Sequence, residues 1–319
     1  MTTSYPIGAH ERSRWILSHR SAKAALDPSR AYATVWEEEL DAAGVVQPVA
    51  AVFLTNKECP YRCLMCDLWR QTLDRAVPAG NIPNQIRAAL STVPAARHVK
   101  LYNAGSFFDP GAIPVADDEA IARAVDSFDR VIVESHPAFL TGRHRDRCLR
   151  FRDAIAGELE IAVGLETAHE ATLARLNKGM TLDSFRRAAE FLASRQIALR
   201  VFILLKPPFT SEDEGIERAC RSIDFAIGCG ATVCTVIPTR GGNGALEALG
   251  DDFAPPALAS LERVIEYGIS RGQCRVFADL WDVERLFTCA CAEPRAERLR
   301  TMNRRQVRAP SVDCAACAR

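Results

Sequence analysis

The chain has 319 residues, of which 48% are hydrophobic and 25% charged, as in an ordinary globular protein that can bury a core. Its 40 basic and 40 acidic residues cancel, so no overall field favours nucleic acid or an acidic membrane. The opening MTTSYPIGAHERSRW lacks the apolar core of a secretory signal. The sequence has no run of about 18 apolar residues, so no membrane span is predicted. We therefore expect a cytoplasmic protein without membrane contact, in which twelve cysteines indicate metal ligation rather than disulfides.

The first 47 residues are predicted to form an N-terminal helical segment. Trp15 and Ile16, and later Trp36 and Leu40, recur at helix-like spacing among charged residues.

From residue 48 onward, short apolar runs alternate with longer amphipathic segments. The runs are rich in β-branched residues and bounded by turn residues, which is typical of buried parallel strands; they are 48–55, 98–105, 130–136, 159–167, 198–206, 231–239 and 274–282. Helices are predicted between them near 83–92, 117–126, 144–157, 170–194, 211–228 and 255–271.

This alternation predicts an α/β fold, a parallel sheet covered by helices, over residues 48–282. The sheet either closes into a partial TIM-like (β/α)6 barrel or stays open and doubly wound. In both architectures functional residues lie on the loops after the carboxyl ends of the strands. Residues 283–319 break the pattern and are rich in Arg and Cys, which predicts a metal-binding C-terminal tail.

The loop after the first predicted strand carries Cys59, Cys63 and Cys66, spaced C-x3-C-x2-C. Structural zinc sites normally use four ligands in paired units, whereas three thiolates can hold three irons of a [4Fe–4S] cluster and leave the fourth open. A zinc site completed by a distant cysteine and a simple electron-transfer cluster are the competing interpretations. Either one would suit a non-enzymatic zinc, nucleic-acid-binding or electron-transfer protein.

This motif, on the first strand-to-helix loop of a repeating βα chain, resembles the radical S-adenosylmethionine (SAM) superfamily. The resemblance implies a partial barrel, a [4Fe–4S] cluster on Cys59, Cys63 and Cys66, and SAM bound to the open iron. It implies reductive cleavage of SAM to a 5′-deoxyadenosyl radical that takes hydrogen from a substrate. Tyr61 and Met65 would then lie beside the cofactor.

Later strand ends resemble the branch of the family that contains the Elongator catalytic subunit. The turn that binds the cofactor's amino group corresponds here to 103–106, namely Asn103, Ala104, Gly105 and Ser106, with one glycine and no acid. The third strand ends in VIVES followed by His136, which replaces the usual arginine.

Three polar residues at strand ends are the catalytic candidates that this resemblance suggests. Glu134 and Glu166 end the third and fourth strands, and Glu166 would also meet the cofactor ribose. Lys206 lies in the phrase LLKPPFTSE, which is similar to the archaeosine-synthesis radical SAM lyases and their uncharacterised bacterial relatives. Ile203, on the same strand, is a further cofactor-binding candidate. The alternative, non-functional interpretations are that Glu166 is a charge at a helix terminus and that Lys206 is a surface lysine.

The tail holds Cys289, Cys291, Cys314 and Cys317, spaced as C-x-C and C-x2-C. Four thiols in two close pairs fit a structural Zn²⁺ site, which we favour, and they also fit an auxiliary iron–sulfur cluster.

The expected partners follow from the resemblance. A reductant protein of the flavodoxin or ferredoxin type would supply electrons. The relatives cut a lysine adduct of a deazaguanine in tRNA, so the leading substrate is an amino-acid-modified deazapurine base, cleaved or rearranged at a C–N or C–C bond. Arginine clusters near 143–152 and 295–308 could meet tRNA, directly or through a partner. The alternative is a radical SAM enzyme acting on a small metabolite of natural-product biosynthesis.

Overall fold

The computed structural model describes residues 4–314. Its main feature is a curled sheet in the order β1-β2-β5-β6-β7-β8-β9-β10. All neighbours are parallel except β1, which runs antiparallel to β2. The strands are β1 (Ala33–Leu40), β2 (Val46–Leu54), β5 (His98–Asn103), β6 (Arg130–Glu134), β7 (Glu158–Glu166), β8 (Ala198–Leu205), β9 (Val233–Pro238) and β10 (Arg275–Ala278). The seven predicted strands are confirmed, and so is the partial-barrel form of the α/β fold.

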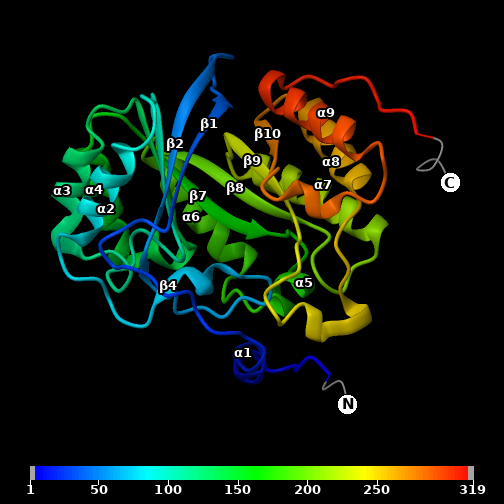
Figure 1. Ribbon diagram of the computed structural model, residues 1–319, viewed down its shortest axis with the longest axis horizontal. Coiled ribbons are helices and arrows are strands. Elements are labelled where there is room, and N and C mark those ends of the chain that lie inside the picture. Colours follow the sequence, from blue (N-terminus) through cyan, green and yellow to red (C-terminus); the bar gives the residue numbers. More distant parts are fainter. Residues whose placement is uncertain (1–3, 315–319) are drawn as a thin grey trace.

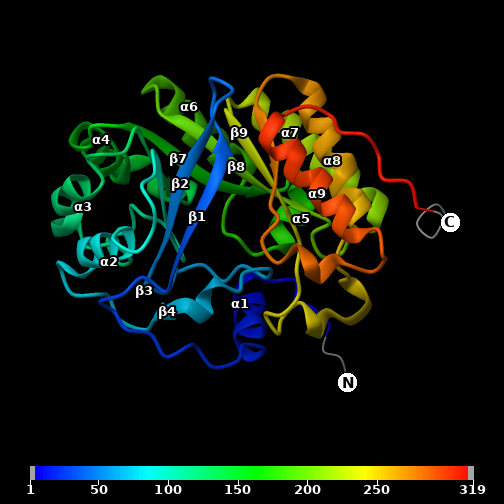
Figure 2. The same ribbon diagram turned by 45° about the horizontal axis from the view of Figure 1, so that its top comes forward.

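Helices cover the outer face of this open half-barrel (Figure 1). They are α2 (Asn81–Leu90), α3 (Asp118–Ala124), α4 (Arg145–Ala154), α5 (Glu170–Arg175), α6 (Leu182–Ser194), α7 (Glu212–Gly228), α8 (Leu258–Arg271) and α9 (Ala292–Arg305). Helix α1 (Ala9–Ser18) lies below the sheet instead, near the segment that bears β4 (Thr72–Leu73) (Figure 1). In the turned view, α2, α3 and α4 lie to the left of the strands, and α7, α8 and α9 lie to their right (Figure 2).

Helix boundaries follow local sequence chemistry. Ser211 and Glu214 form the capping box that starts α7, each side chain accepting the other's backbone N–H. The single helix predicted over 170–194 is instead two, α5 and α6, because Asn177 and Gly179 adopt positive φ angles of 56° and 72° between them.

Residues 33–40 correct the helical expectation for the N-terminal segment. Helix α1 is present, but Trp36 and Leu40 belong to strand β1. The sequence ATVWEEEL alternates between two faces, and Glu37 and Glu39 on one face meet Lys100 of β5. Pairing with β2 and these ion pairs outweigh the local helical spacing.

The two faces of the sheet differ in their solvent contact. On the helix-covered face, residues such as Leu101, Val133 and Val201 are fully buried in the main hydrophobic core. Along the concave face, alternate residues such as Tyr102 and Phe202 are only half-buried. Solvent therefore reaches the inside of the half-barrel, where the strand ends carry polar groups.

Candidate active site

The three loop cysteines lie at the carboxyl end of the sheet. They follow β2, on a loop closed by parallel pairing of β3 (Asn56–Lys57) with β4 (Thr72–Leu73). The light-blue segment that bears β4 crosses below the sheet, next to α1 (Figure 1). The loop thus occupies the edge where chemistry was expected.

Two asparagines hold the loop from distant segments. Asn243 Nδ2 donates to the carbonyl of Leu64 at 2.7 Å and to that of Cys66 at 3.3 Å. Asn177 Nδ2 donates to the carbonyl of Arg62 at 2.8 Å. Sequence reasoning missed both, and their only local signal is a position in or beside a glycine-containing turn.

A carboxylate at the start of the loop ties it to the N-terminal segment. Glu58 accepts from Arg20 and Lys23 at 2.7 Å each and lies 3.2 Å from Arg62. These cations lower the pKa of Glu58 against the effect of its burial. The network fixes the approach of the chain to Cys59.

Burial favours the neutral form of the cysteine thiols. It raises the pKa of Cys66 to about 11 and also raises those of Cys59 and Cys63, while Lys178 opposes the shift at Cys63. Thiolates at these positions therefore need a cation, such as iron, to offset desolvation.

Lys178 forms the principal ion pair of the site. Its Nζ lies 2.6 Å from Oε1 of Glu166, and both side chains are nearly buried. Glu166, at the end of β7, has a φ of 65° next to a bulge, a strained conformation typical of functional positions. Burial acts to lower the pKa of Lys178, but the carboxylate of Glu166 raises it above its usual value, so Lys178 stays cationic. The pairing with Lys178 was not predicted.

His136, where the resembling branch has arginine, acts as a neutral support. Its ring stacks on Tyr61 with centroids 4.0 Å apart. Nδ1 accepts the backbone N–H of Ala138, so Nε2 carries the proton and donates to the carbonyl of Lys178 at 3.2 Å. Burial lowers the pKa of His136 to about 3.

The predicted 103–106 turn lies against the cysteine loop. A side chain at Gly105 would come within 3.5 Å of Cβ of Cys59 and 3.7 Å of the amide nitrogen of Asn103. Ala104 is buried, and Ser106 accepts the backbone N–H of His136 at 2.9 Å.

Asn103 itself is buried, and neither atom of its side-chain amide has a hydrogen-bond partner within residues 4–314. Burying such a group without partners is costly, which indicates that a polar ligand completes it.

The remaining predicted residues lie at different depths. Glu134 is half-buried at the end of β6, where desolvation raises its pKa to about 8. Lys206 pairs with Glu212 at 2.8 Å on the start of α7. Ile203 is fully buried in the main core, and Met65 packs in a second cluster with Trp15 of α1.

The donor set of the loop fits a [4Fe–4S] cluster. Over residues 4–314, the loop thiols are not among the groups whose ligand atoms all lie within 4.8 Å of one another. Each thiolate of a four-iron cluster binds a different iron, so such ligands stand farther apart than those of one tetrahedral ion. Three thiols together with the unpaired amide of Asn103 match a cluster that leaves one iron for a polar ligand.

The tail cysteines form a separate group. Cys289, Cys291 and Cys314 place their sulfur atoms within 4.8 Å of one another, so this group could hold a metal. Cys317, the fourth predicted ligand, lies outside the described residues.

Comparison with curated proteins finds relatives along most of the chain. An uncharacterized protein of Methanocaldococcus jannaschii is 24% identical over 93% of this chain and 87% of its own. Archaeosine synthase subunit beta of Methanosarcina acetivorans is 30% identical over 52% of this chain, and that of Thermococcus kodakarensis 27% identical over 60%. The chain spans only 49% and 62% of the length of these two subunits.

Solved structures share the fold. Methylornithine synthase aligns with a TM-score of 0.55 at 12% identity, over 91% of this chain and 77% of its own. The archaeal Elp3 of Methanocaldococcus infernus aligns with a TM-score of 0.51 at 13% identity, over 79% of this chain and 63% of its own. A search of family models finds no match to the chain. Within residues 4–314, no helix is both long and apolar enough to cross a bilayer.

Proposed function

The chain belongs to the radical SAM superfamily, and we propose from this premise that it cleaves SAM reductively and abstracts hydrogen from a substrate. The observation that carries the proposal is the C-x3-C-x2-C loop at the carboxyl end of the half-barrel, beside Asn103, whose side-chain amide has no hydrogen-bond partner in the described part of the chain. When bound, the reduced cluster would supply the single electron needed to cleave the S–C5′ bond of SAM, and the hydrogen atom taken from the substrate would end up in 5′-deoxyadenosine.

The chain's own residues bind and orient the reactants. Cys59, Cys63 and Cys66 hold the cluster, and the amide of Asn103 offers both a donor and an acceptor to the polar end of SAM. Glu166 is suited to accept from the ribose hydroxyls, and its ion pair with Lys178 fixes the position of its carboxylate.

Other predicted residues serve the same site in this proposal. Tyr61, whose ring stacks on His136, and Met65, which packs against the cluster of Trp15, are proposed to contact the cofactor from the loop. We propose only supporting roles for Lys206 and Ile203. Lys206 pairs with Glu212, and Ile203 lies in the main hydrophobic core.

Glu134 is the residue best placed to exchange a proton with substrate. It faces the solvent-accessible concave side of the sheet, and its pKa of about 8 keeps it largely protonated near neutral pH. A neutral carboxyl can donate to a substrate atom that gains electron density.

The substrate we favour is an amino-acid-modified deazapurine base, cleaved or rearranged at a C–N or C–C bond in a lyase-type reaction. Support comes from the LLKPPFTSE phrase and from the two relatives named as archaeosine synthase subunits.

A small metabolite is the second candidate, and the state of the arginine clusters favours it. Arg147 pairs with Asp118, and Arg298 with Glu262, so these arginines are not available to a phosphate backbone. In the tRNA case a partner protein would bring the RNA.

For either substrate, a flavodoxin or ferredoxin in the cytoplasm would donate the electron. The metal of the tail, Zn²⁺ or an auxiliary cluster, would take no part in the chemistry.

The test uses anaerobically reconstituted protein reduced with dithionite and mixed with SAM. We expect 5′-deoxyadenosine by mass spectrometry from the wild type and none from the Cys63→Ala variant. Adding tRNA that carries the lysine-modified deazaguanine should increase the formation of 5′-deoxyadenosine, convert the base within the tRNA and release the amino-acid fragment. An increase only with small metabolites would move the substrate to the second candidate, and absence of deoxyadenosine under every condition would contradict the proposal.

A further inference from the structure

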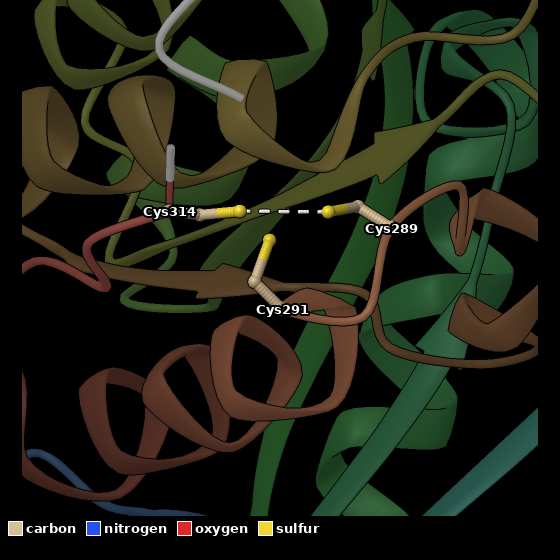
Figure 3. A group of neighbouring side chains, drawn as sticks. All are labelled: Cys289, Cys291 and Cys314. Atoms are coloured by element: carbon tan, nitrogen blue, oxygen red, sulfur yellow. Dashed lines mark hydrogen bonds between the residues drawn. The ribbon is translucent and has the colours of Figure 1, made fainter. Parts of the chain in front are cut away.

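The tail thiols are grouped more tightly than those of the loop. The sulfur atoms of Cys289, Cys291 and Cys314 all lie within 4.8 Å of one another and point toward a common centre (Figure 3). Those of Cys289 and Cys314 are 3.5 Å apart. Thiolates on one tetrahedral Zn²⁺, each about 2.3 Å from the metal, lie about 3.8 Å from one another. The group therefore has the dimensions of a single-ion site, and its separation exceeds the roughly 2.0 Å of a disulfide.

Two distant segments meet at this group. Cys289 and Cys291 directly precede α9, whereas Cys314 arrives on the chain that returns after α9. Arg298 on α9 donates to the carbonyls of Ala309 and Pro310 on the returning chain, at 2.7 Å each.

Arg298 and its neighbour on α9, Arg295, are also anchored to α8 of the barrel. Arg298 also pairs with the buried Glu262 of α8 at 2.9 Å, and Arg295 pairs with the same carboxylate. The return of the tail is thus held by arginine–carbonyl contacts, with few apolar contacts of its own.

We propose that Cys289, Cys291 and Cys314 bind one Zn²⁺, which fastens the returning tail to the start of α9. Three thiolates occupy three of the four positions of a tetrahedral zinc ion. A four-iron cluster needs thiolates on separate irons and a wider spacing, as in the loop. The site is structural because its ligands join two chain segments, and metal binding offsets the entropy of ordering a tail with few apolar residues.

Arg295 is a positioning residue of this site. Its Nε donates to Sγ of Cys291 at 3.4 Å. A hydrogen bond to a metal-bound thiolate disperses part of its negative charge and fixes its orientation, and losing such a contact typically weakens metal affinity 10- to 100-fold. Arg300 lies on the same helix and pairs with Glu293 and Glu297, and within residues 4–314 it donates to no cysteine sulfur, which makes it the matched comparison.

Metal analysis of variants tests the ion and its separation from the loop. We would purify the full chain anaerobically and measure iron and zinc in three forms: wild type, Cys59→Ala/Cys63→Ala/Cys66→Ala, and Cys289→Ser/Cys314→Ser. The loop variant should lose all iron and keep about one zinc per chain, and the tail variant should lose zinc while keeping iron and deoxyadenosine formation. Iron retained by the loop variant would make the tail an iron–sulfur site and overturn the proposal. Zinc-free wild type with Cys289 and Cys314 disulfide-bonded would overturn it as well. Neither outcome bears on the radical chemistry, which the deoxyadenosine assay reports.

Two further readouts test the roles of Arg295 and of the metal. Arg295→Ala should release zinc to a chelator about 10-fold more readily, whereas the control Arg300→Ala should leave the affinity near that of the wild type. Equal weakening by Arg295→Ala and Arg300→Ala would show that the hydrogen bond from Arg295 to the Cys291 sulfur does not determine the affinity, and it would contradict this role. Cleavage by trypsin after Arg308 should quicken when zinc is removed, and an unchanged rate would contradict the fastening role.

Discussion

The buried polar residues at the two ends of the half-barrel differ in whether they find partners within the protein. At the amino end, Glu39 is bound by Lys100 at 2.7 Å and by Arg200, whose Nε donates to Glu160 at 2.6 Å, so the buried charges satisfy one another. At the carboxyl end, the amide of Asn103 has no partner within residues 4–314. The amino end completes the fold, and the carboxyl end keeps unused hydrogen-bonding capacity for a ligand.

Removing a loop thiol should give the largest effect. Cys63→Ala deprives the cluster of one of three ligands, so we expect complete loss of loop iron and of deoxyadenosine formation, with the tail metal retained. Iron content and the product assay check this. Simultaneous loss of iron and zinc would instead mean that the two cysteine sets form one shared site.

A charge removed at the amino end should cost stability and leave chemistry intact. Glu39→Gln leaves Lys100 and Arg200 short of a buried partner, a loss of about 3–5 kcal/mol in the free energy of unfolding. Glu37→Gln is the control, since Glu37 also pairs with Lys100 but its side chain is 40% exposed, and it should cost less than about 1 kcal/mol. Deoxyadenosine formed per bound cluster should stay unchanged in both variants.

This difference should depend on pH. Arg200 and Lys100 hold the pKa of Glu39 below its usual 4.5 in the folded state, despite burial. The resulting stability is fully present above pH 4.5 and is lost as the pH falls through the lower folded value. Urea unfolding at several pH values should therefore show the Glu39→Gln penalty shrinking only in acid. A penalty that shrinks above pH 5 would contradict the assignment.

An intermediate effect is expected for the ion pair between Lys178 and Glu166 at the carboxyl end of the half-barrel. Lys178→Met leaves Glu166 without its cation, which should cost about 2–3 kcal/mol of stability and weaken SAM binding as well. The double variant Lys178→Met/Glu166→Gln should recover part of the stability but not the binding. Recovery of both would make the pair purely structural.

Asn103→Ala should have the smallest effect on stability. It should also separate most clearly the effect on ligand binding, at the carboxyl end, from the effect on stability. Because no hydrogen bond within the described chain is lost, we expect the free energy of unfolding to change by less than about 1 kcal/mol. Affinity for SAM, measured by calorimetry on the reconstituted protein, should fall about 10-fold. Normal affinity would show that the amide does not meet the cofactor.

Sequence patterns predict what depends on neighbouring residues and miss what depends on distant ones. The parallel strands and the cysteine spacings are local, and both were readable. Strand β1 was not, because its glutamates find their partners on β5 and β8. Likewise, Lys178 and Asn243 gain meaning only once folding places them beside Glu166 and the cysteine loop.

The most direct test of the central claim is the electron paramagnetic resonance spectrum of the reduced loop cluster, recorded before and after adding SAM to the Cys289→Ser/Cys314→Ser variant. The proposed site leaves one iron open to SAM, so the signal should change on addition. An unchanged signal would mean that the cluster has no site for SAM and that the carboxyl end of the half-barrel serves electron transfer instead.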